Sequence, residues 1–248
     1  MARFFMAGLN VPRGGTVLLT GEDAEHARVL RLRIGEKIVV SNGDGEDIRC
    51  TVRGFTREGV EAEAEETVPN LAEPSVAVTV LVGLPKQGER ADYIVQKCTE
   101  CGATRIVFFR SHRCVADPGA KSVEKKLIRW KRIAEEAAKQ SGRGIIPEVG
   151  YAEDFGEALD IADKTELPLF LYETGERTAL KEVLDAEAGN VASAAILTGP
   201  EGGFEAYEAQ LARQVNFRIC AMGPRILRCE TAPVAALTAI MYATGNLS

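Results

Sequence analysis

Short apolar runs separated by polar turn residues fill the first third of the chain. The strand candidates lie at residues 16–19, 36–40 and 47–52. Asn42-Gly43-Asp44-Gly45 lies between the last two and is a strong signal for a hairpin turn. Residues 21–26 predict one short helix, with Asp23 as a plausible N-cap. Together these signals predict a small β-barrel over residues 1–70.

The pattern changes after residues 67–74, which contain two prolines, show no periodicity and predict a linker. Strands and helices then alternate, which is typical of an α/β domain with a mainly parallel sheet. The predicted strands are 76–82, 105–109, 167–172, 194–197 and 217–221, and the predicted helices are 89–101, 123–140 and 231–244. In such sheets, ligands bind beyond the carboxyl ends of the strands.

The composition is that of an ordinary globular protein, with 46% hydrophobic and 27% charged residues in a chain of 248. No apolar run reaches the roughly 20 residues that span a bilayer, and the N-terminus lacks the features of a signal peptide. We therefore expect a cytoplasmic protein without a membrane segment.

The charge is unevenly distributed along the chain. The net charge of −6 argues against an indiscriminate nucleic-acid binder, yet ten Lys/Arg and only four Asp/Glu lie between residues 110 and 143. The predicted helix 123–140 within this stretch places its cations opposite an apolar face that contains Trp130. The stretch fits either a surface for a polyanion or a solvated helix face.

Six cysteines lack the spacing of a disulfide framework, and we expect free thiols. Cys98-Thr99-Glu100-Cys101 has the CxxC spacing of zinc and redox sites, but the sequence has no second CxxC or HxxxH to complete four ligands. Ile94, Cys98 and Cys101 fall on one side of a helix, which favours a buried apolar face. We therefore expect no metal.

Two glycine-rich corners follow predicted strands. The first is Leu197-Thr198-Gly199-Pro200-Glu201-Gly202-Gly203-Phe204, and the second runs from Met222 to Pro233. Such turns let the backbone approach a ligand closely, although a turn needed only for folding is the alternative. The first corner lacks the lysine of a phosphate loop and the GxGxxG pattern, and its central glutamate favours a cationic or hydroxyl-rich ligand. The pair predicts one small-molecule pocket.

Both corners resemble the signature of the ribosomal RNA small subunit methyltransferase E (RsmE) family, which belongs to the SPOUT class of knotted methyltransferases. The resemblance extends over essentially the whole chain. Its other motifs are His26 to Arg31, Lys86, Lys97 to Gly102, Glu136 to Arg143 with Pro147, and Leu171 to Glu173.

The resemblance implies a fold, an activity and partners. Residues 1–70 would form a PUA-like RNA-binding β-barrel, and residues 71–248 a SPOUT methyltransferase domain with a parallel sheet and a deep trefoil knot. The activity would be methylation of N3 of a uridine in 16S ribosomal RNA, with S-adenosyl-L-methionine as cofactor. The substrate would lie within the small ribosomal subunit, and the enzyme would be a homodimer.

The resemblance also implies site residues. The cofactor would be surrounded by Leu171, Tyr172, Glu173, Thr198, Gly199, Pro200, Glu201, Gly202, Gly203, Met222, Gly223, Ile226, Leu227 and Thr231. The candidates for RNA binding are Arg3, His26, Arg28, Arg31, Lys86, Arg90, Arg110, Arg113 and Arg143. Arginines suit phosphates and exposed bases through planar, multidentate hydrogen bonding. A structural role for His26 is equally open.

Arg228 is the catalytic candidate because it lies in the second corner, beside the expected pocket. When uridine N3 loses its proton, negative charge spreads to the flanking carbonyl oxygens, and a fixed arginine would stabilise that charge. Alternatively, Arg228 orders the loop by pairing with Glu201 or Glu230. Glu230 itself fits either a general base or a favourable acidic residue at a helix start.

Two other functions stay open. The chain fits a non-catalytic RNA-binding module, in which the barrel and the basic helix act and the pocket is vestigial. An unrelated nucleotide-binding enzyme is the second alternative, which the missing phosphate-loop lysine weakens.

Overall fold

The computed structural model describes residues 1–115 and 119–247. Contacts divide the chain into two compact units. The first unit comprises residues 1–73 together with 138–146, and the second comprises the rest of the chain from Pro74.

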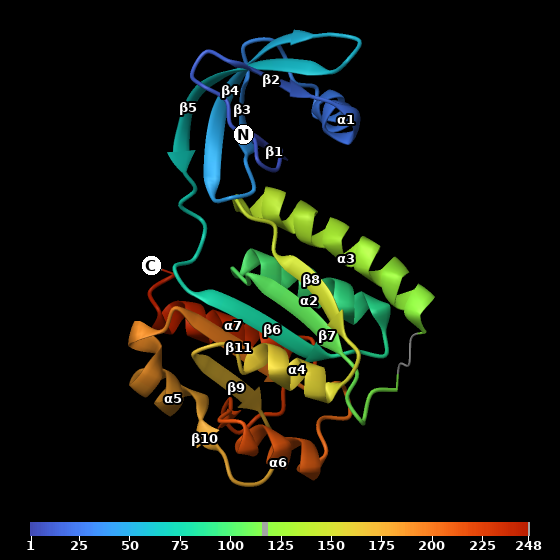
Figure 1. The fold of residues 1–248 in the computed structure, drawn as a ribbon, viewed down its shortest axis with the longest axis vertical. Coiled ribbons are helices and arrows are strands. Elements are labelled where there is room, and N and C mark those ends of the chain that lie inside the picture. The colour runs from blue at the N-terminus through green and yellow to red at the C-terminus, as the bar shows by residue number, and fades with distance from the viewer. Residues whose placement is uncertain (116–118, 248) are drawn as a thin grey trace. The chain divides into compact units, whose positions relative to one another are not determined.

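The first unit is built on a five-stranded sheet with the order β1-β3-β4-β5-β2. Its elements are β1 (Ala2–Phe5), β2 (Thr16–Leu19), α1 (Gly21–Val29), β3 (Lys37–Ser41), β4 (Glu46–Phe55) and β5 (Val60–Pro69). Only the β1–β3 pair is parallel. Two register shifts in β4 bend the sheet, as bulges do. Within residues 1–73, β1 and β2 do not pair, so the sheet is a curled half-barrel with open edges (Figure 1).

Three details of this unit correct the sequence-based prediction. The supposed linker is partly strand, because Thr67–Pro69 forms the end of β5. Asp23 lies within the first turn of α1 and does not cap it, since Thr20 is the N-cap residue. An acidic side chain in the first turn still complements the helix dipole. Strands β1 and β5 were not predicted as strands.

The segment 138–146 is held within the first unit by polar contacts. The Asn70 amide donates to the Gly142 carbonyl (3.0 Å). The Glu73 carboxylate accepts hydrogen bonds from Arg143 Nη2 (2.7 Å) and from the backbone N–H groups of Gly144 (2.8 Å) and Ile145 (2.9 Å).

The second unit contains a seven-stranded sheet with the order β10-β12-β9-β11-β6-β7-β8. Its strands are β6 (Ala77–Gly83), β7 (Arg105–Phe109), β8 (Glu148–Ala152), β9 (Leu167–Leu171), β10 (Thr178–Ala179), β11 (Ser193–Thr198) and β12 (Arg218–Ala221). Every pair is parallel, which confirms the predicted α/β class. The prediction missed β8 and the two-residue β10.

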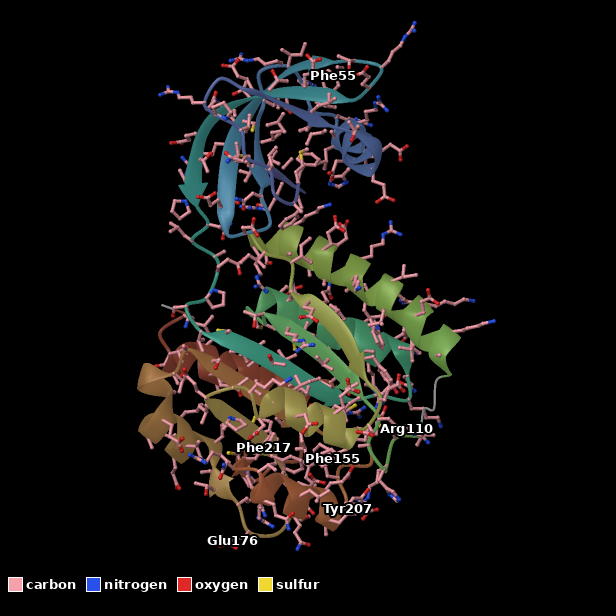
Figure 2. All side chains as sticks on the ribbon, in the orientation of Figure 1. Phe55, Arg110, Phe155, Glu176, Tyr207 and Phe217 are labelled. Carbon is pink, nitrogen blue, oxygen red and sulfur yellow. The ribbon has the colours of Figure 1, made fainter. Side chains whose placement is uncertain are left out.

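Helices cover both faces of this sheet. They are α2 (Gly88–Glu100), α3 (Ala120–Ser141), α4 (Phe155–Ala162), α5 (Leu180–Glu187), α6 (Ala206–Gln214) and α7 (Thr231–Ala243), with a 3₁₀ turn at Ala188–Asn190. Figure 1 shows α4 and α7 on opposite sides of the sheet. Phe155 of α4 and Phe217 before β12, both labelled in Figure 2, lie in the core of the face that α4 and α6 cover. On α3, Trp130 is buried against Phe108, with ring centroids 4.3 Å apart.

None of the helices in the described residues has both the length and the apolar character to cross a membrane.

Candidate active site

A pocket of about 360 Å³ lies at the carboxyl ends of β9, β11 and β12. The three strands run in parallel, with Leu171 in register with Cys220 and Phe170 in register with Leu197, so their ends meet at one edge of the sheet. The loops that follow them supply most of the pocket wall. This is the place where open parallel sheets bind ligands.

Most of the predicted cofactor residues line this pocket. They are Leu171, Tyr172, Glu173, Thr198, Gly199, Pro200, Glu201, Gly203, Met222, Gly223, Ile226 and Leu227. Gly202 and Thr231 are not among the lining residues. A Cβ added at Gly202 would lie 3.1 Å from the Cβ of Arg113, so Gly202 packs against that side chain. Contact of these residues with a cofactor stays a prediction.

The pocket is also lined by residues that were not predicted from the sequence to belong to it. They are Arg90, Arg177, Cys220, Ala221, Pro224, Arg225, Cys229 and Ala232, together with the catalytic candidate Arg228. Most belong to the same three loops, so their position next to the signature residues could have predicted that they line the pocket. Arg90 is different, because it comes from α2 and was grouped with the RNA-binding candidates.

The backbone of the pocket loops needs glycine at two positions. Gly203 and Gly223 have φ angles of 66° and 75°, a region that side chains disfavour. No atom lies within 4 Å of a Cβ built on Gly223, so this lining residue borders open space. The loop therefore leaves room for a ligand close to its backbone.

Glu201 in the first corner is engaged by two partners. Its carboxylate accepts hydrogen bonds from the Lys86 backbone N–H (3.1 and 3.2 Å) and from Arg90 Nη1 (2.9 Å). The alternative that Glu201 pairs with Arg228 is therefore wrong. On the other side of this corner, Arg113 donates to the Gly202 carbonyl (2.9 Å) and forms a two-bond pair with Glu205 (2.9 and 3.1 Å).

Cys229 and Glu230 end the second corner. The Cys229 thiol donates to Glu230 Oε2 (3.2 Å), and burial together with this carboxylate raises the pKa of Cys229 to about 12. The thiol is thus protonated at neutral pH and is no thiolate nucleophile. Burial opposes ionisation of Glu230, but hydrogen bonds and the charges of Arg90 and Arg228 outweigh it and lower the pKa of this carboxyl. Glu230 is the N-cap residue of α7, yet its side chain makes no capping hydrogen bond.

Arg228 is exposed at the pocket wall. Within residues 1–115 and 119–247, its guanidinium has no hydrogen-bond or ion-pair partner, and the pairings with Glu201 and Glu230 considered for it are absent. A cation held in a pocket wall without a carboxylate partner is available to a ligand.

The candidates for RNA binding in the first unit fall into two groups. Arg3 forms a two-bond pair with Asp47 (2.6 and 2.9 Å), and Arg143 is buried against Glu73, so neither guanidinium is exposed for phosphate contact. These two assignments are corrected to structural ion pairs. Arg28 and Arg31 are exposed at the end of α1, with no side-chain partner in the described part of the chain. His26 is half-buried, edge-on to Phe4 at 6.0 Å.

In the second unit, Lys86, Arg110 and Arg113 are exposed, and Arg110 follows the carboxyl end of β7 (Figure 2). Arg113 is committed to the Gly202 carbonyl and Glu205, as described above. The hydrogen bond to Glu205 is the main cause that raises the pKa of Arg113, so this cation stays charged.

The CxxC cysteines occupy the end of α2. Cys98 is fully buried, and burial raises the pKa of its thiol. Cys101 Sγ lies 3.8 Å from the Thr238 hydroxyl. Across the described ranges, no three His, Cys, Asp or Glu side chains come together as a group that could hold a metal.

Comparison with known proteins identifies the class to which this fold and pocket belong. Residues 72–241 match the RNA methyltransferase domain family, and residues 19–65 match the RNA methyltransferase PUA domain family. The sheet, its pocket and these two matches define an RNA methyltransferase with a PUA domain.

Individual relatives narrow this class. The chain is 32% identical over 251 residues to ribosomal RNA small subunit methyltransferase E of Bacillus subtilis, covering 98% of this chain and 97% of the relative. A crystal structure of the enzyme of that name from Neisseria gonorrhoeae, bound to S-adenosyl methionine, is 31% identical with a TM-score of 0.86 and 98% of each chain covered. A putative methyltransferase from Legionella pneumophila, in complex with the bound cofactor SAM, is 27% identical with a TM-score of 0.86 over 98% of each chain. The chain belongs to the ribosomal RNA small subunit methyltransferase E family.

Proposed function

We propose that this protein transfers a methyl group from S-adenosylmethionine to N3 of a uridine in 16S ribosomal RNA, within the small ribosomal subunit. The observation that carries the proposal is the pocket at the sheet edge, which unites three loops of the family signature. The N. gonorrhoeae relative with bound S-adenosyl methionine supports the choice of cofactor.

The residues of the pocket fit this cofactor. Leu171, Ile226 and Leu227 give apolar surface for the adenine ring, and the open space at Gly223 lets the ligand approach the backbone. The exposed carboxylate of Glu173 complements a cationic ligand. When bound, S-adenosylmethionine supplies a methyl group already activated on a sulfonium. The work left to the protein is therefore positioning and charge stabilisation.

We assign the charge stabilisation to Arg228. Methylation at N3 requires the loss of a proton whose pKa lies well above neutral, and the resulting negative charge spreads over two carbonyl oxygens. The unpaired guanidinium of Arg228 in the pocket wall interacts more strongly with that anion than with the neutral base. Removing one such donor typically lowers kcat by about 10²–10³-fold.

The proposal also covers substrate binding, oligomeric state and place of action. The exposed Arg28 and Arg31 of the first unit contact the RNA backbone. The working enzyme is a homodimer, as the resemblance to the family implies. Its place of action is the cytoplasm, where the small ribosomal subunit is assembled.

The test is methyl transfer from labelled S-adenosylmethionine to small ribosomal subunits that lack the modification, followed by nucleoside analysis of the RNA. We expect label in N3-methyluridine, and we expect Arg228→Ala to lose it without a change in cofactor affinity by calorimetry. Arg218→Ala is the matched control, because Arg218 pairs with Glu187 at the amino end of β12, away from the pocket edge.

Two outcomes would overturn the proposal. Label in a ribose or another base would refute the assignment to N3 of uridine. Absence of S-adenosylmethionine binding with RNA binding retained would support the non-catalytic module.

A further inference from the structure

We propose that Arg90 is a positioning residue that ties the two glycine-rich corners together and thereby keeps Arg228 unpaired. The inference rests on the proposed function, because Arg228 is its catalytic residue. Arg90 was expected at an RNA surface, but its side chain lines the pocket and is only 24% exposed.

The contacts of Arg90 reach both corners from a third element, α2. Arg90 Nη1 lies 2.9 Å from Glu201 Oε1 in the first corner. Its Nε lies 3.8 Å from Glu230 Oε2, and Nη1 lies 3.8 Å from Cys229 Sγ, both at the end of the second corner. One planar guanidinium with several N–H donors therefore contacts two carboxylates, which belong to loops far apart in the sequence.

The charges explain why this bridge matters for Arg228. Glu201 lines the same pocket as Arg228, and Glu230 is close enough that the charge of Arg228 contributes to its lowered pKa. Arg90 engages both carboxylates, and the Lys86 backbone N–H and the Cys229 thiol occupy further oxygen lone pairs. Without Arg90, two poorly compensated carboxylates would compete with the substrate for the Arg228 guanidinium.

We expect the contacts of Arg90 with Glu201 and Glu230 to affect the geometry of the pocket more than the stability of the fold. Glu201 and Glu230 are 30% and 20% exposed, and ion pairs that water reaches contribute little to folding. Loss of Arg90 should therefore lower kcat much more than it lowers the melting temperature. Arg90→Lys keeps the charge but not the planar fork, so its activity should lie between those of the wild type and Arg90→Ala.

The first measurement compares the wild type, Arg90→Ala, Arg90→Lys and the control Arg218→Ala in methyl transfer to small subunits. We expect Arg90→Ala to lower kcat at least tenfold when it is measured at saturating cofactor. The variant Arg90→Ala/Glu201→Gln/Glu230→Gln removes the competing charges and should recover most of the lost kcat. If Arg90 is only structural, the triple variant should have a lower kcat than Arg90→Ala.

The second measurement does not depend on methyl transfer. Phenylglyoxal modifies unpaired arginines, and peptide mass spectrometry follows its reaction at Arg228. We expect modification of Arg228 to slow several-fold in Arg90→Ala and to return in the triple variant. Unchanged modification of Arg228 in Arg90→Ala overturns the inference, as does an unchanged kcat. If the wild type transfers no methyl group, the proposed function fails, and the modification rates still decide the role of Arg90.

Discussion

Gly83 gives a direct test of whether the first corner must keep its position for cofactor binding. It ends β6, in register with Phe109 of β7, and its backbone supports the turn at Pro200. A Cβ at Gly83 would lie 2.7 Å from Pro200 N and 3.2 Å from the Gly199 carbonyl carbon, distances at which one partner must shift. β6 is paired on both sides by β7 and β11, whereas Pro200 lies in the loop after the end of β11, so we expect the corner to move.

The size of the effect follows from the cost of overpacking, about 1–3 kcal/mol for an added group in a packed site. If restoring the bound position of the corner requires this strain, each 1.4 kcal/mol weakens cofactor binding tenfold. We therefore expect Gly83→Ala to raise the Kd for S-adenosylmethionine about tenfold or more, with a modest fall in melting temperature. Isothermal calorimetry and a thermal melt measure the two quantities.

Gly150→Ala is the matched control for this substitution. Gly150 lies in β8, and its added Cβ would meet Val107 Cγ2 at 3.8 Å, an ordinary van der Waals contact. Its Kd should stay that of the wild type. A Gly83→Ala protein with wild-type affinity and wild-type melting temperature would refute the argument that the corner rests on Gly83.

Two further predictions concern stability. Arg143→Ala leaves the Glu73 carboxylate without its nearly buried partner, and we expect a loss of about 3 kcal/mol in urea unfolding; a loss below 1 kcal/mol would contradict the structural role given to this pair. Burial raises the pKa of Cys50 to about 11, so the unfolded state releases this proton first and stability falls as the pH rises from about 9 towards 11. Melting temperatures across this range should fall less steeply for Cys50→Ala, and equal slopes would show that Cys50 does not contribute.

The strands that are predicted best from the sequence are those whose own side chains form a continuous apolar run. Ile106–Phe109 is an apolar run buried in the sheet interior, and the predicted and observed bounds of its strand, Arg105–Phe109, agree. Strand β5 escaped prediction because Glu61, Glu63 and Glu65 alternate with small residues of low strand propensity. It forms because β4 and β2 pair with it, and such long-range pairing has no local signal.

The candidate site divides in the same way. The two corners were predictable because glycine and proline at strand ends mark close approaches, and parallel strands bring their ends together. The partner of Glu201 could not be predicted, since Arg90 lies 111 residues earlier in the chain. The contact between Gly202 and Arg113 spans 89 residues and was equally hidden. Pairings of this kind depend on where helices and loops lie after folding.

The folded chain shows which cations of the basic stretch are accessible. Helix α3 buries Trp130 and exposes Lys125, Lys131 and Arg132, so its cations form a solvated helix face. A solvated cationic face is accessible to a phosphate backbone, so RNA binding by the basic stretch stays a prediction. Arg143, by contrast, belongs to the same stretch and is neutralised by Glu73. Since each phosphate contact adds its own salt-dependent contribution, we expect affinity for RNA to depend on accessible cations more than on the net charge of −6.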